Sequence, residues 1–460
     1  MADRIPAQRG GPGPGGLVVV LGGGIAGLAA ADRLSQAGWR VRIVEKDRRC
    51  GGVHRARQIG PYTFGVGSIF YEENARLFDL APGLRNLCPT VMRVQRRIAP
   101  DGAILHYPLE PREFLRQSPL RLARSVVDLA WSRLWVRRDG TLDAIARQRL
   151  GGSFFESTGL ASYISRFHHV SPREIDEVFF FRRMAYVERF TRIGALARSA
   201  ARSLLSRAPV NQRTRRPLRV RPREGFEPIF ERIERRLAAS GVEFSLGDAL
   251  LSLRREGGLF HLRTASGSCF AEAVVSTIPL DSLHQAMFGV GSGLVSLDMT
   301  TLFVSAAHLD RRLGNVLFNF HPRGQWKRAT IYSRIYPDAA GRDGGFDREF
   351  LAVETTIPPG GSHDPQRIFE DFRKHMTVLG LARDLTLEGH ERVENCYPLY
   401  TPGSGAILEQ ALHRISRSGI ILAGRQGRFE YLPTSSGVIL RVMQELDAAG
   451  LFAAAPEMAA

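Results

Sequence analysis

The sequence predicts an α/β fold whose first domain is built on a parallel sheet. An apolar run at Leu17–Leu21 is short enough to be a buried strand. A glycine-rich turn follows this run and leads into a helical pattern that ends near Gly38. A second strand covers residues 41–44 of the 460-residue chain. Strand, glycine turn, helix and strand in this order are typical of a Rossmann-like domain.

The glycine-rich turn has the spacing of a phosphate-binding loop. Gly22, Gly24 and Gly27 fall at G-x-G-x-x-G spacing. Gly22 allows the tight turn, Gly24 lets a pyrophosphate approach the backbone, and Gly27 lets the helix lie close to the strand. The N–H groups of the first helical turn, around Ile25 and Ala26, would bind the phosphates with the help of the helix dipole. The sequence therefore predicts a dinucleotide site.

An acidic residue ends the second strand. Glu45 lies 18 positions after Gly27, near the roughly 20 expected for a residue that bonds a ribose hydroxyl. Its charge would repel a 2′-phosphate, which argues against NADP, and Lys46 beside it is expected at the same site. Gly51 and Gly52 then resemble the glycine pair of FAD-binding proteins of the glutathione-reductase-like class. The cofactor that this resemblance implies is FAD.

The composition is strongly basic. The chain has 63 Lys and Arg against 46 Asp and Glu, a net charge of +17, and its lysines are Lys46, Lys327 and Lys374. The arginine bias has a bland explanation in a GC-rich genome, and a functional one in an anionic partner such as a phosphorylated substrate or an acidic membrane surface. The sequence shows no nucleic-acid motif, so we do not expect nucleic acid as a partner.

Cysteine and histidine patterns argue against a metal site. The four cysteines are widely spaced without a C-x-x-C pair, which fits buried thiols in a reducing compartment. The adjacent His168 and His169 cannot share one helix face. Apolar runs stay below the length of a membrane span. We therefore expect a cytoplasmic protein without a metal, and we expect residues 1–16, rich in Gly, Pro and Arg, to be a disordered tail.

The segment after the glycine pair carries a second resemblance. Residues 62–67 resemble the segment of flavin amine oxidases that carries Phe-Asp-x-Gly beside the flavin. Phe64 and Gly67 fit that pattern, whereas Gly65 stands where aspartate is usual. Gly67 would let the backbone approach the ring, and an ordinary glycine turn is the alternative interpretation.

The next part of the chain is predicted to leave the first domain. Residues 93–109 look like a hairpin with a turn at Asp101-Gly102, and their Tyr-Pro-Leu ending resembles the entry to the second domain in protoporphyrinogen-oxidase-like and UDP-galactopyranose-mutase-like proteins. Residues 110–216 are helical in pattern. Within them, residues 112–138 fit either a basic amphipathic helix on a membrane or a helix that covers a core. Ser171 and Pro172 should open a further helix.

The pattern changes again after about residue 207. Residues 207–223 are expected to be a mobile surface linker, and an amphipathic helix, several strands and a mostly antiparallel sheet that would roof the flavin should follow. The ranges predicted are a helix at 225–237, strands starting at 241 and covering 249–254, 259–263 and 270–277, the sheet within 281–395, and a helix at 364–379. Tyr332-Ser333-Arg334 resembles the Tyr-Thr-Arg of the mutases, which implies that Arg334 holds a substrate diphosphate. A surface arginine on a strand is the alternative.

The closing stretch resembles the segment that passes the flavin ring. A strand at 420–423 ends on Gly424-Arg425-x-Gly427, and a helix starts near Ser435. The positive end of that helix would stabilise negative charge on the reduced ring. The mutases carry an aspartate about where Ser435 stands. Tyr397 precedes a proline as in mutases and related oxidases, which implies that it borders the substrate.

Taken together, these motifs resemble the FAD-dependent amine-oxidase-like group, which includes protoporphyrinogen oxidases and UDP-galactopyranose mutases. The resemblance implies a glutathione-reductase-like FAD-binding domain with an interleaved α+β substrate domain. The FAD-binding domain would take residues 17–95, 225–280 and 395–450, and the substrate domain residues 96–224 and 281–394.

Three functions are compatible with this resemblance. The first is an FAD-dependent oxidoreductase that passes a hydride from an organic substrate to flavin N5. The second is a redox-neutral mutase acting on a nucleotide sugar, which would need prior flavin reduction and would use no oxygen. The third is a non-catalytic scaffold with a flavin fold. The sequence does not identify a catalytic acid or base.

Overall fold

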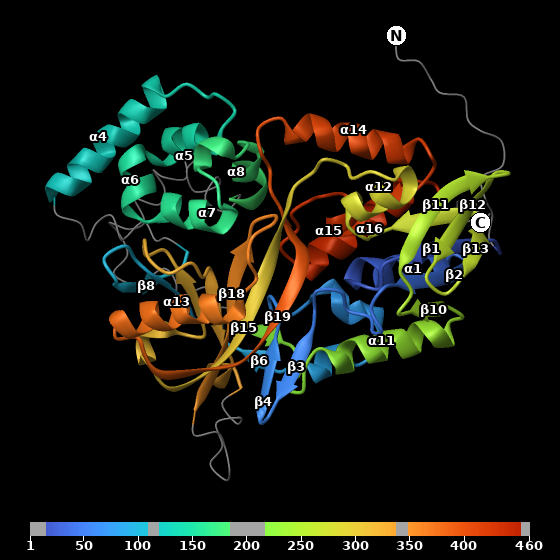
Figure 1. Cartoon of the computed structure of the whole chain (residues 1–460), viewed down its shortest axis with the longest axis horizontal. Helices are drawn as coiled ribbons and strands as arrows, with labels where there is room; N and C mark the ends of the chain where they lie inside the picture. The colour runs from blue at the N-terminus through green and yellow to red at the C-terminus, as the bar shows by residue number, and fades with distance from the viewer. Residues whose placement is uncertain (1–14, 109–118, 185–216, 337–347, 452–460) are drawn as a thin grey trace, which may run out of the picture.

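The computed structural model describes residues 15–108, 119–184, 217–336 and 348–451 (Figure 1). The predicted tail at 1–16 therefore lies almost wholly outside the described residues. Within the described part, a five-stranded sheet and a seven-stranded sheet stand side by side, and a group of helices adjoins the larger sheet.

The five-stranded sheet is parallel throughout, which confirms the predicted α/β class. Its strand order is β10-β2-β1-β14-β20. The bounds are β1 Leu17–Leu21, β2 Arg40–Glu45, β10 Glu243–Leu246, β14 Ala273–Ser276 and β20 Ile421–Leu422. Three distant parts of the sequence thus meet in one sheet, and the first of them contains the glycine-rich turn.

Both faces of this sheet are covered, because alternate side chains of β1 enter different cores. Val18 and Val20 pack with α1 (Ile25–Gln36), α11 (Glu227–Ala239) and α16 (Ser435–Ala448). Val19 and Leu21 pack with the opposite layer. That layer contains an antiparallel three-stranded sheet and two helices: β11 Leu250–Glu256, β12 Leu259–Thr264, β13 Ser268–Ala271, α12 Leu280–Phe288 and α14 Ser404–Ser416.

The seven-stranded sheet has the order β19-β15-β18-β17-β16-β7-β8. Its bounds are β7 Gln95–Ile98, β8 Ile104–His106, β15 Ser296–Leu309, β16 Val316–Asn319, β17 Arg328–Ile331, β18 Glu349–Ile357 and β19 Ala382–Pro398. The predicted antiparallel character is confirmed for most pairs, but β7 runs parallel to β16. Helix α13 (Pro365–Val378) packs Phe369, Phe372 and Met376 on one face of the sheet.

Two small sheets join the larger units. One pairs β3 Ala56–Ile59 with β4 Tyr62–Gly65, and the other has the order β5-β9-β6, with β5 Phe70–Tyr71, β6 Thr90–Val91 and β9 Leu218–Val220. The prediction of a surface linker over 207–223 is wrong for its last part, because residues 218–220 form β9 and Arg221 is fully buried. Residues 207–216 lie outside the described part.

A separate group of helices adjoins the seven-stranded sheet (Figure 1). It comprises α4 Pro119–Trp135, α5 Leu142–Leu150, α6 Gly152–Ser157, α7 Leu160–His168 and α8 Val178–Arg183. Ser171 does form a capping box, but it opens only a 3₁₀ turn at Pro172–Glu174. The helix that this pair was predicted to open is thus one 3₁₀ turn, because the chain is extended at Ile175, whose carbonyl accepts a hydrogen bond from the Leu142 N–H.

Shorter helical elements complete the described chain. They are η1 Arg76–Leu80, α2 Leu84–Leu87, η4 Arg311–Leu313, η5 Tyr332–Arg334 and α15 Gly424–Gly427. Across the described ranges, we find neither a helix long and apolar enough to cross a membrane nor a group of three His, Cys, Asp or Glu side chains that could hold a metal ion. The four cysteines are free thiols.

Candidate functional site

The glycine-rich turn connects β1 to α1 and has little room for side chains at two of its glycines. Gly22 has a φ of +103°, a conformation that favours glycine. A Cβ on Gly27 would lie 1.8 Å from the Gly22 carbonyl oxygen, so only glycine lets α1 start this close to β1. At Gly24 the situation differs, because the nearest atom to an added Cβ would be the Gly52 Cα at 3.9 Å. The backbone at Gly24 therefore borders open space.

Helix α1 begins at this open space without a side-chain cap. Its N-cap is Gly24, and its first turn contains no acidic residue. Ile25 is buried, whereas Ala26 is partly exposed. An uncapped helix N-terminus offers backbone N–H groups and a partial positive charge to an anion. The loop and the helix together form a site suited to a phosphate.

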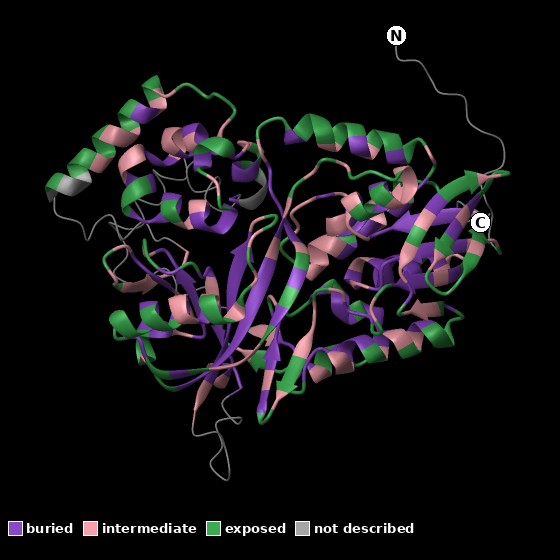
Figure 2. Cartoon of the chain, in the orientation of Figure 1, coloured by how far each residue is buried: buried purple, intermediate pink, exposed green. Residues whose placement is uncertain are grey.

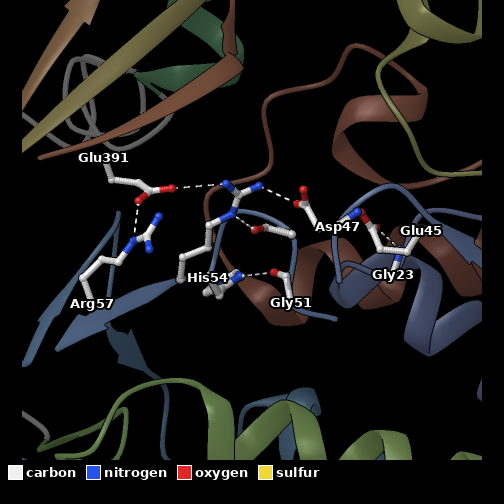
Figure 3. Close-up of polar contacts among 9 residues, drawn as sticks. Gly23, Glu45, Asp47, Gly51, His54, Arg57 and Glu391 are labelled. Atoms are coloured by element: carbon white, nitrogen blue, oxygen red, sulfur yellow. Dashed lines mark hydrogen bonds and ion pairs between the residues drawn. The ribbon is translucent and has the colours of Figure 1, made fainter. Parts of the chain in front are cut away.

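Glu45 lies beside the loop at the end of β2. Its side chain is 7% exposed, and its carboxylate accepts hydrogen bonds from the Gly23 N–H at 2.5 Å and the Asp47 N–H at 2.9 Å (Figure 3). A side chain at position 23 would crowd the Glu45 Cγ, which would lie 3.1 Å from the new Cβ. Lys46, the next residue, is exposed. The carboxylate is therefore held against the backbone of the phosphate loop.

The glycine pair lies against this loop at close range. Gly51 and Gly52 have φ values of +127° and +60°, and the Gly51 N–H donates to the Gly23 carbonyl at 2.9 Å. A Cβ on Gly52 would lie 3.3 Å from the Gly24 Cα. A side chain at Gly52 would narrow the gap between the two segments, whereas one at Gly51 would crowd the His54 carbonyl and the Phe230 ring at 3.1 Å. The glycine at position 52 therefore keeps a cradle open against Gly24.

A cleft of about 450 Å³ lies next to this cradle. Its lining includes Cys50, Gly52, His54 and Phe230 together with charged side chains, which are Asp47, Arg48, Arg49, Arg55, Arg57, Glu227 and Glu391. Burial lowers the pKa of His54 to about 4, so its imidazole is neutral at pH 7. Burial likewise raises the pKa of the Cys50 thiol to about 12. The polar character of the cleft therefore comes from its arginines and carboxylates.

Arg55 joins the glycine pair to the seven-stranded sheet. Its Nε donates to the Gly52 carbonyl at 3.0 Å, and its guanidinium pairs with Asp47 at 2.6 Å and with Glu391 of β19 at 3.3 Å. Glu391 also pairs with Arg57 at 2.7 Å (Figure 3). Sequence reasoning missed this link, because Glu391 lies more than 300 residues from both arginines.

The C-terminal segment meets the start of α1. Gly424 has a φ of +73°, and a Cβ there would lie 2.6 Å from the Ala26 Cβ. A Cβ on Gly427 would lie 2.5 Å from the Ser276 carbonyl oxygen of β14. Both glycines thus allow the segment to pass close to the sheet and to the phosphate loop. Ser435 is the first residue of α16, whose cap is the Thr434 hydroxyl, which accepts from the Gly437 N–H at 3.1 Å.

Arg425 extends from this contact towards two tyrosines. Its guanidinium carbon lies 5.1 Å from the centre of the Tyr397 ring and 5.4 Å from that of Tyr431. One terminal nitrogen donates to the Cys396 carbonyl at 2.6 Å, while the buried Nε has no hydrogen-bond partner within the described chain. The structure therefore brings Arg425 and Tyr397, both singled out from sequence, to one place.

Three further charged residues surround Tyr397. Lys327, which is 5% exposed, donates from Nζ to the Tyr397 hydroxyl at 2.8 Å and pairs with Glu354 at 3.0 Å. Arg328 pairs with the same carboxylate. We call Lys327, Arg328, Glu354, Tyr397 and Arg425 the Tyr397 cluster. The cluster contains three cations and one carboxylate, so it carries a positive surplus that suits an anionic or electron-rich group.

Protonation states within the Tyr397 cluster follow from burial and charge. Burial alone would raise the pKa of Glu354, but the charges of Arg328 and Lys327 and their hydrogen bonds lower it to about 2. Burial raises the pKa of Tyr397 well above its ordinary value, with Cys396 and Glu354 adding to the shift. At neutral pH the carboxylate is ionised and the phenol keeps its proton. The cluster can therefore bind and orient a group, and its phenol can donate a hydrogen bond.

One signal in the sequence could have pointed to the Tyr397 cluster. Lys327 is one of three lysines in a chain whose other strongly basic residues are arginines, and it lies directly before β17, where it is buried. A lysine is a compact charge that titrates more readily than arginine when it is buried. Glu354 gave no comparable signal.

Gly67 and Arg334, which were also singled out from sequence, do not belong to the Tyr397 cluster. Gly67 has a φ of +75° and open space where a Cβ would lie. Arg334 pairs with Glu349 at 2.8 Å and donates to the carbonyls of Leu309, Asp310 and Gly314. Leu309 is the last residue of β15, whereas Tyr397 pairs with Leu297 near the other end of that strand. The structure therefore does not bring Arg334 together with Tyr397.

The position where the related proteins carry aspartate is filled by other groups. A Cβ on Gly65 would lie 3.0 Å from the Tyr332 hydroxyl and 3.1 Å from the Arg221 Nε. Arg221 is fully buried and donates to the Thr63 carbonyl at 2.7 Å and the Pro222 carbonyl at 2.7 Å. A tyrosine hydroxyl and a guanidinium thus occupy the space that an aspartate side chain would need.

Comparisons with known proteins extend this description. The family model described as flavin containing amine oxidoreductase matches residues 25–313, which is more than half of the chain. A 1-hydroxycarotenoid 3,4-desaturase from Flavobacterium sp. (strain P99-3) is 45% identical over 53 residues, and the match spans 12% of this chain and 11% of the desaturase.

Solved structures share the fold over nearly the whole chain. A reduced UDP-galactopyranose mutase superposes with a TM-score of 0.75 at 16% identity and covers 96% of both chains. A putative protoporphyrinogen oxidase from Exiguobacterium sp. 255-15 superposes with a TM-score of 0.70 at 18% identity, covering 95% of this chain and 99% of its own. At these identities the likeness concerns the fold alone.

Proposed function

Because the chain belongs to the family of flavin-containing amine oxidoreductases, we propose that it is an FAD-dependent oxidoreductase that moves a hydride from an organic substrate to the flavin N5. The observation that carries the FAD assignment is the cradle between Gly24 and Gly52. It has a helix N-terminus at one side and the Glu45 carboxylate at the other. This donor set fits a pyrophosphate followed by a ribose diol.

We assign the cofactor contacts along one path through the site. Backbone N–H groups at Gly22, Gly24 and the first turn of α1 would hold the pyrophosphate, with Gly27 allowing the close approach of the helix. Glu45 would exchange its bond to the Gly23 N–H for the ribose hydroxyls. The remaining expected contacts come from residues around this path, which are Ile25, Ala26, Lys46, Gly51, Gly52, Gly67, Gly424, Gly427 and Ser435.

The Tyr397 cluster would face the reactive end of the cofactor. Gly424 touches Ala26, and Arg425 next to it reaches Tyr397, so the path from the phosphate loop leads directly to this cluster. When bound, FAD supplies the two-electron acceptor. The side chains position the substrate, and the cations stabilise negative charge there.

The division of the chain into an FAD-binding domain and a substrate domain is part of the same proposal. All strands of the parallel sheet come from residues 17–45, 243–276 and 421–422, which lie inside the three stretches assigned to the FAD-binding domain. Helices α4 to α8 and most of the seven-stranded sheet come from the stretches assigned to the substrate domain. The assignment places the cofactor path between the two sheets.

Anaerobic reduction of the bound flavin tests the oxidoreductase assignment. The purified protein is mixed without oxygen with a primary amine, with protoporphyrinogen and, in a separate experiment, with a carotenoid. Loss of the oxidised-flavin absorbance with one of these classes, reversed by air, supports the proposal. A flavin that no class reduces, in a protein that retains its flavin, speaks against it.

A mutase reaction is a second candidate, and the positive surplus of the Tyr397 cluster favours it. Lys327, Arg328 and Arg425 gather around Tyr397, as a diphosphate-linked sugar would require. Arg334, which the resemblance assigned to the diphosphate, is engaged with Glu349 instead. If only the reduced enzyme isomerises UDP-galactopyranose, and does so without consuming oxygen, this candidate is supported over the first.

A further inference from the structure

Helix α4 presents an apolar face to solvent. Leu120, Val127, Trp131 and Leu134 are 84%, 67%, 60% and 73% exposed, and Trp135 beside them is 58% exposed. Positions 120, 127, 131 and 134 lie on one side of an α-helix, so these side chains form one apolar stripe along it. Figure 2 shows α4 at the edge of the molecule, with exposed residues along its outer side. Large exposed apolar side chains that cluster in this way mark an interaction site.

The opposite face fixes the helix on the protein. Ser132 is buried, and the Asp128 carboxylate accepts a hydrogen bond from the Ser153 N–H of α6 at 2.8 Å. The one acidic residue of α4 therefore points inward. Arg124 is exposed on the same side of the helix as the apolar stripe, and Arg137 is exposed just after the C-terminal end of α4. The outward side consequently combines apolar side chains with positive charge and no carboxylate of its own helix.

We propose that α4 docks this protein on an anionic lipid surface, with Leu120, Val127, Trp131, Leu134 and Trp135 entering the headgroup boundary. An amphipathic helix with tryptophans on its apolar face and arginines beside it is the arrangement that lies in a membrane interface. Trp131 and Trp135 are in contact, with ring centroids 5.2 Å apart. The net charge of +17 adds a longer-range attraction to anionic headgroups.

A second copy of the chain fits this surface less well. A two-fold contact through α4 would bring the exposed arginines of both copies, Arg124 and Arg137, into one interface, where like charges repel. A neutral lipid surface would also leave the arginines without counter-charges. Anionic lipid satisfies both the apolar stripe and its cationic border.

Tryptophan fluorescence reports on this helix specifically. The chain has four tryptophans, of which Trp39 and Trp326 are buried, while Trp131 and Trp135 lie on the α4 face. We expect vesicles of phosphatidylglycerol and phosphatidylcholine in equal parts to shift the emission to the blue and to protect it from acrylamide. Vesicles of phosphatidylcholine alone should give a much smaller effect, and high salt should weaken binding to the anionic vesicles.

Co-sedimentation with the same vesicles compares two matched variants of the full chain. Trp131→Glu with Leu134→Glu places two charges on the stripe, whereas Leu251→Glu with Val378→Glu places two charges on other exposed apolar positions. We expect the first variant to lose about tenfold or more in vesicle affinity, and the second to stay within about twofold of wild type. Both should keep the wild-type unfolding temperature, because all four side chains are exposed.

Three results would overturn the proposal. These are unchanged vesicle binding by the α4 variant, equal loss in both variants, or binding that does not depend on anionic lipid. Light scattering adds a fourth possible contradiction, and this measurement needs no lipid. A dimer of wild type that the α4 substitutions convert to a monomer would assign the face to a second copy of the chain instead.

Discussion

At the scale of single residues, two glycines of the phosphate loop should respond differently to the same substitution. Gly27→Ala would place a methyl group 1.8 Å from the Gly22 carbonyl oxygen, so the loop or α1 must move. We expect a loss of about 3 kcal/mol or more in the free energy of unfolding, together with loss of flavin. Urea unfolding and the flavin content of the purified protein measure the two effects.

Gly24→Ala is the matched control for this prediction. Its added methyl group would meet only the Gly52 Cα at 3.9 Å, so the fold should tolerate it within about 1 kcal/mol. The methyl group would nevertheless fill space that we assign to the pyrophosphate, and flavin affinity should fall by about tenfold or more. A Gly24→Ala protein with normal flavin affinity would contradict the assignment of the cradle.

Glu45 is the residue that should distinguish FAD from FMN. We assign its carboxylate to the ribose of the adenosine half, which FMN lacks. Glu45→Ala should therefore weaken FAD binding by about tenfold, which corresponds to about 1.4 kcal/mol, and leave FMN binding unchanged. Titration of the apoprotein with each flavin, followed by fluorescence quenching, measures this difference. An equal loss for both flavins would mean that Glu45 acts only on the loop.

At the scale of elements, strands β17, β18 and β19 carry Arg328, Glu354 and Tyr397 of the Tyr397 cluster and should make stability depend on pH. The folded-state pKa of Glu354 is about 2, below its ordinary value of 4.5. The ionised carboxylate therefore stabilises the fold above a pH of about 4.5, and this contribution is lost as the pH falls toward 2. The shift corresponds to about 3 kcal/mol.

Glu354→Gln tests this dependence. At pH 7 the variant leaves Lys327 and Arg328 without their buried counter-charge and should be less stable than wild type by about 3 kcal/mol. The difference between the two proteins should shrink as the pH falls from about 4.5 toward 2, because wild type then also loses the charge. Urea unfolding at several pH values measures it, and a difference that stays constant over this range would refute the interpretation.

Elements defined by local pattern could be predicted from the sequence, while those defined by distant partners could not. The strand at 17–21 and the helix after Gly24 follow from hydrophobic periodicity and turn glycines. The parallel pairing of β7 with β16 joins Gln95 to Val316, and no local signal specifies it. The segment after Ser171 carried a correct capping signal, but the hydrogen bond from Leu142 to Ile175 turned the chain into an extended conformation.

The residues of the candidate site also divide into those that a local pattern predicts and those that distant partners bring together. Gly22, Gly24, Gly27 and Glu45 lie within one short stretch, so their spacing alone places them together. Tyr397 could be singled out by the resemblance of its segment, but its neighbours were not predicted as site residues: Lys327 lies directly before β17 and Glu354 lies on β18. Their approach depends on the order of strands in the seven-stranded sheet, which a single sequence does not reveal.

At the scale of the whole molecule, the proposed flavin path joins parts of the chain that are far apart in sequence. It runs from the β1–α1 loop past Gly424 to the Tyr397 cluster, and Arg55 links its beginning to Glu391 of β19. A ligand that binds only the folded chain stabilises all of these parts together. Saturation with FAD at about 100 times its dissociation constant should therefore add about 2.7 kcal/mol to the free energy of unfolding.

The most direct test of the central claim is the absorption spectrum of the purified protein before and after denaturation. We predict flavin bands in the native protein that are released on denaturation as free FAD, identified by chromatography against FMN. Protein that loses its flavin during purification should regain the bands when FAD is added. A colourless protein that does not take up added FAD would contradict the account, including both enzymatic functions considered for this chain.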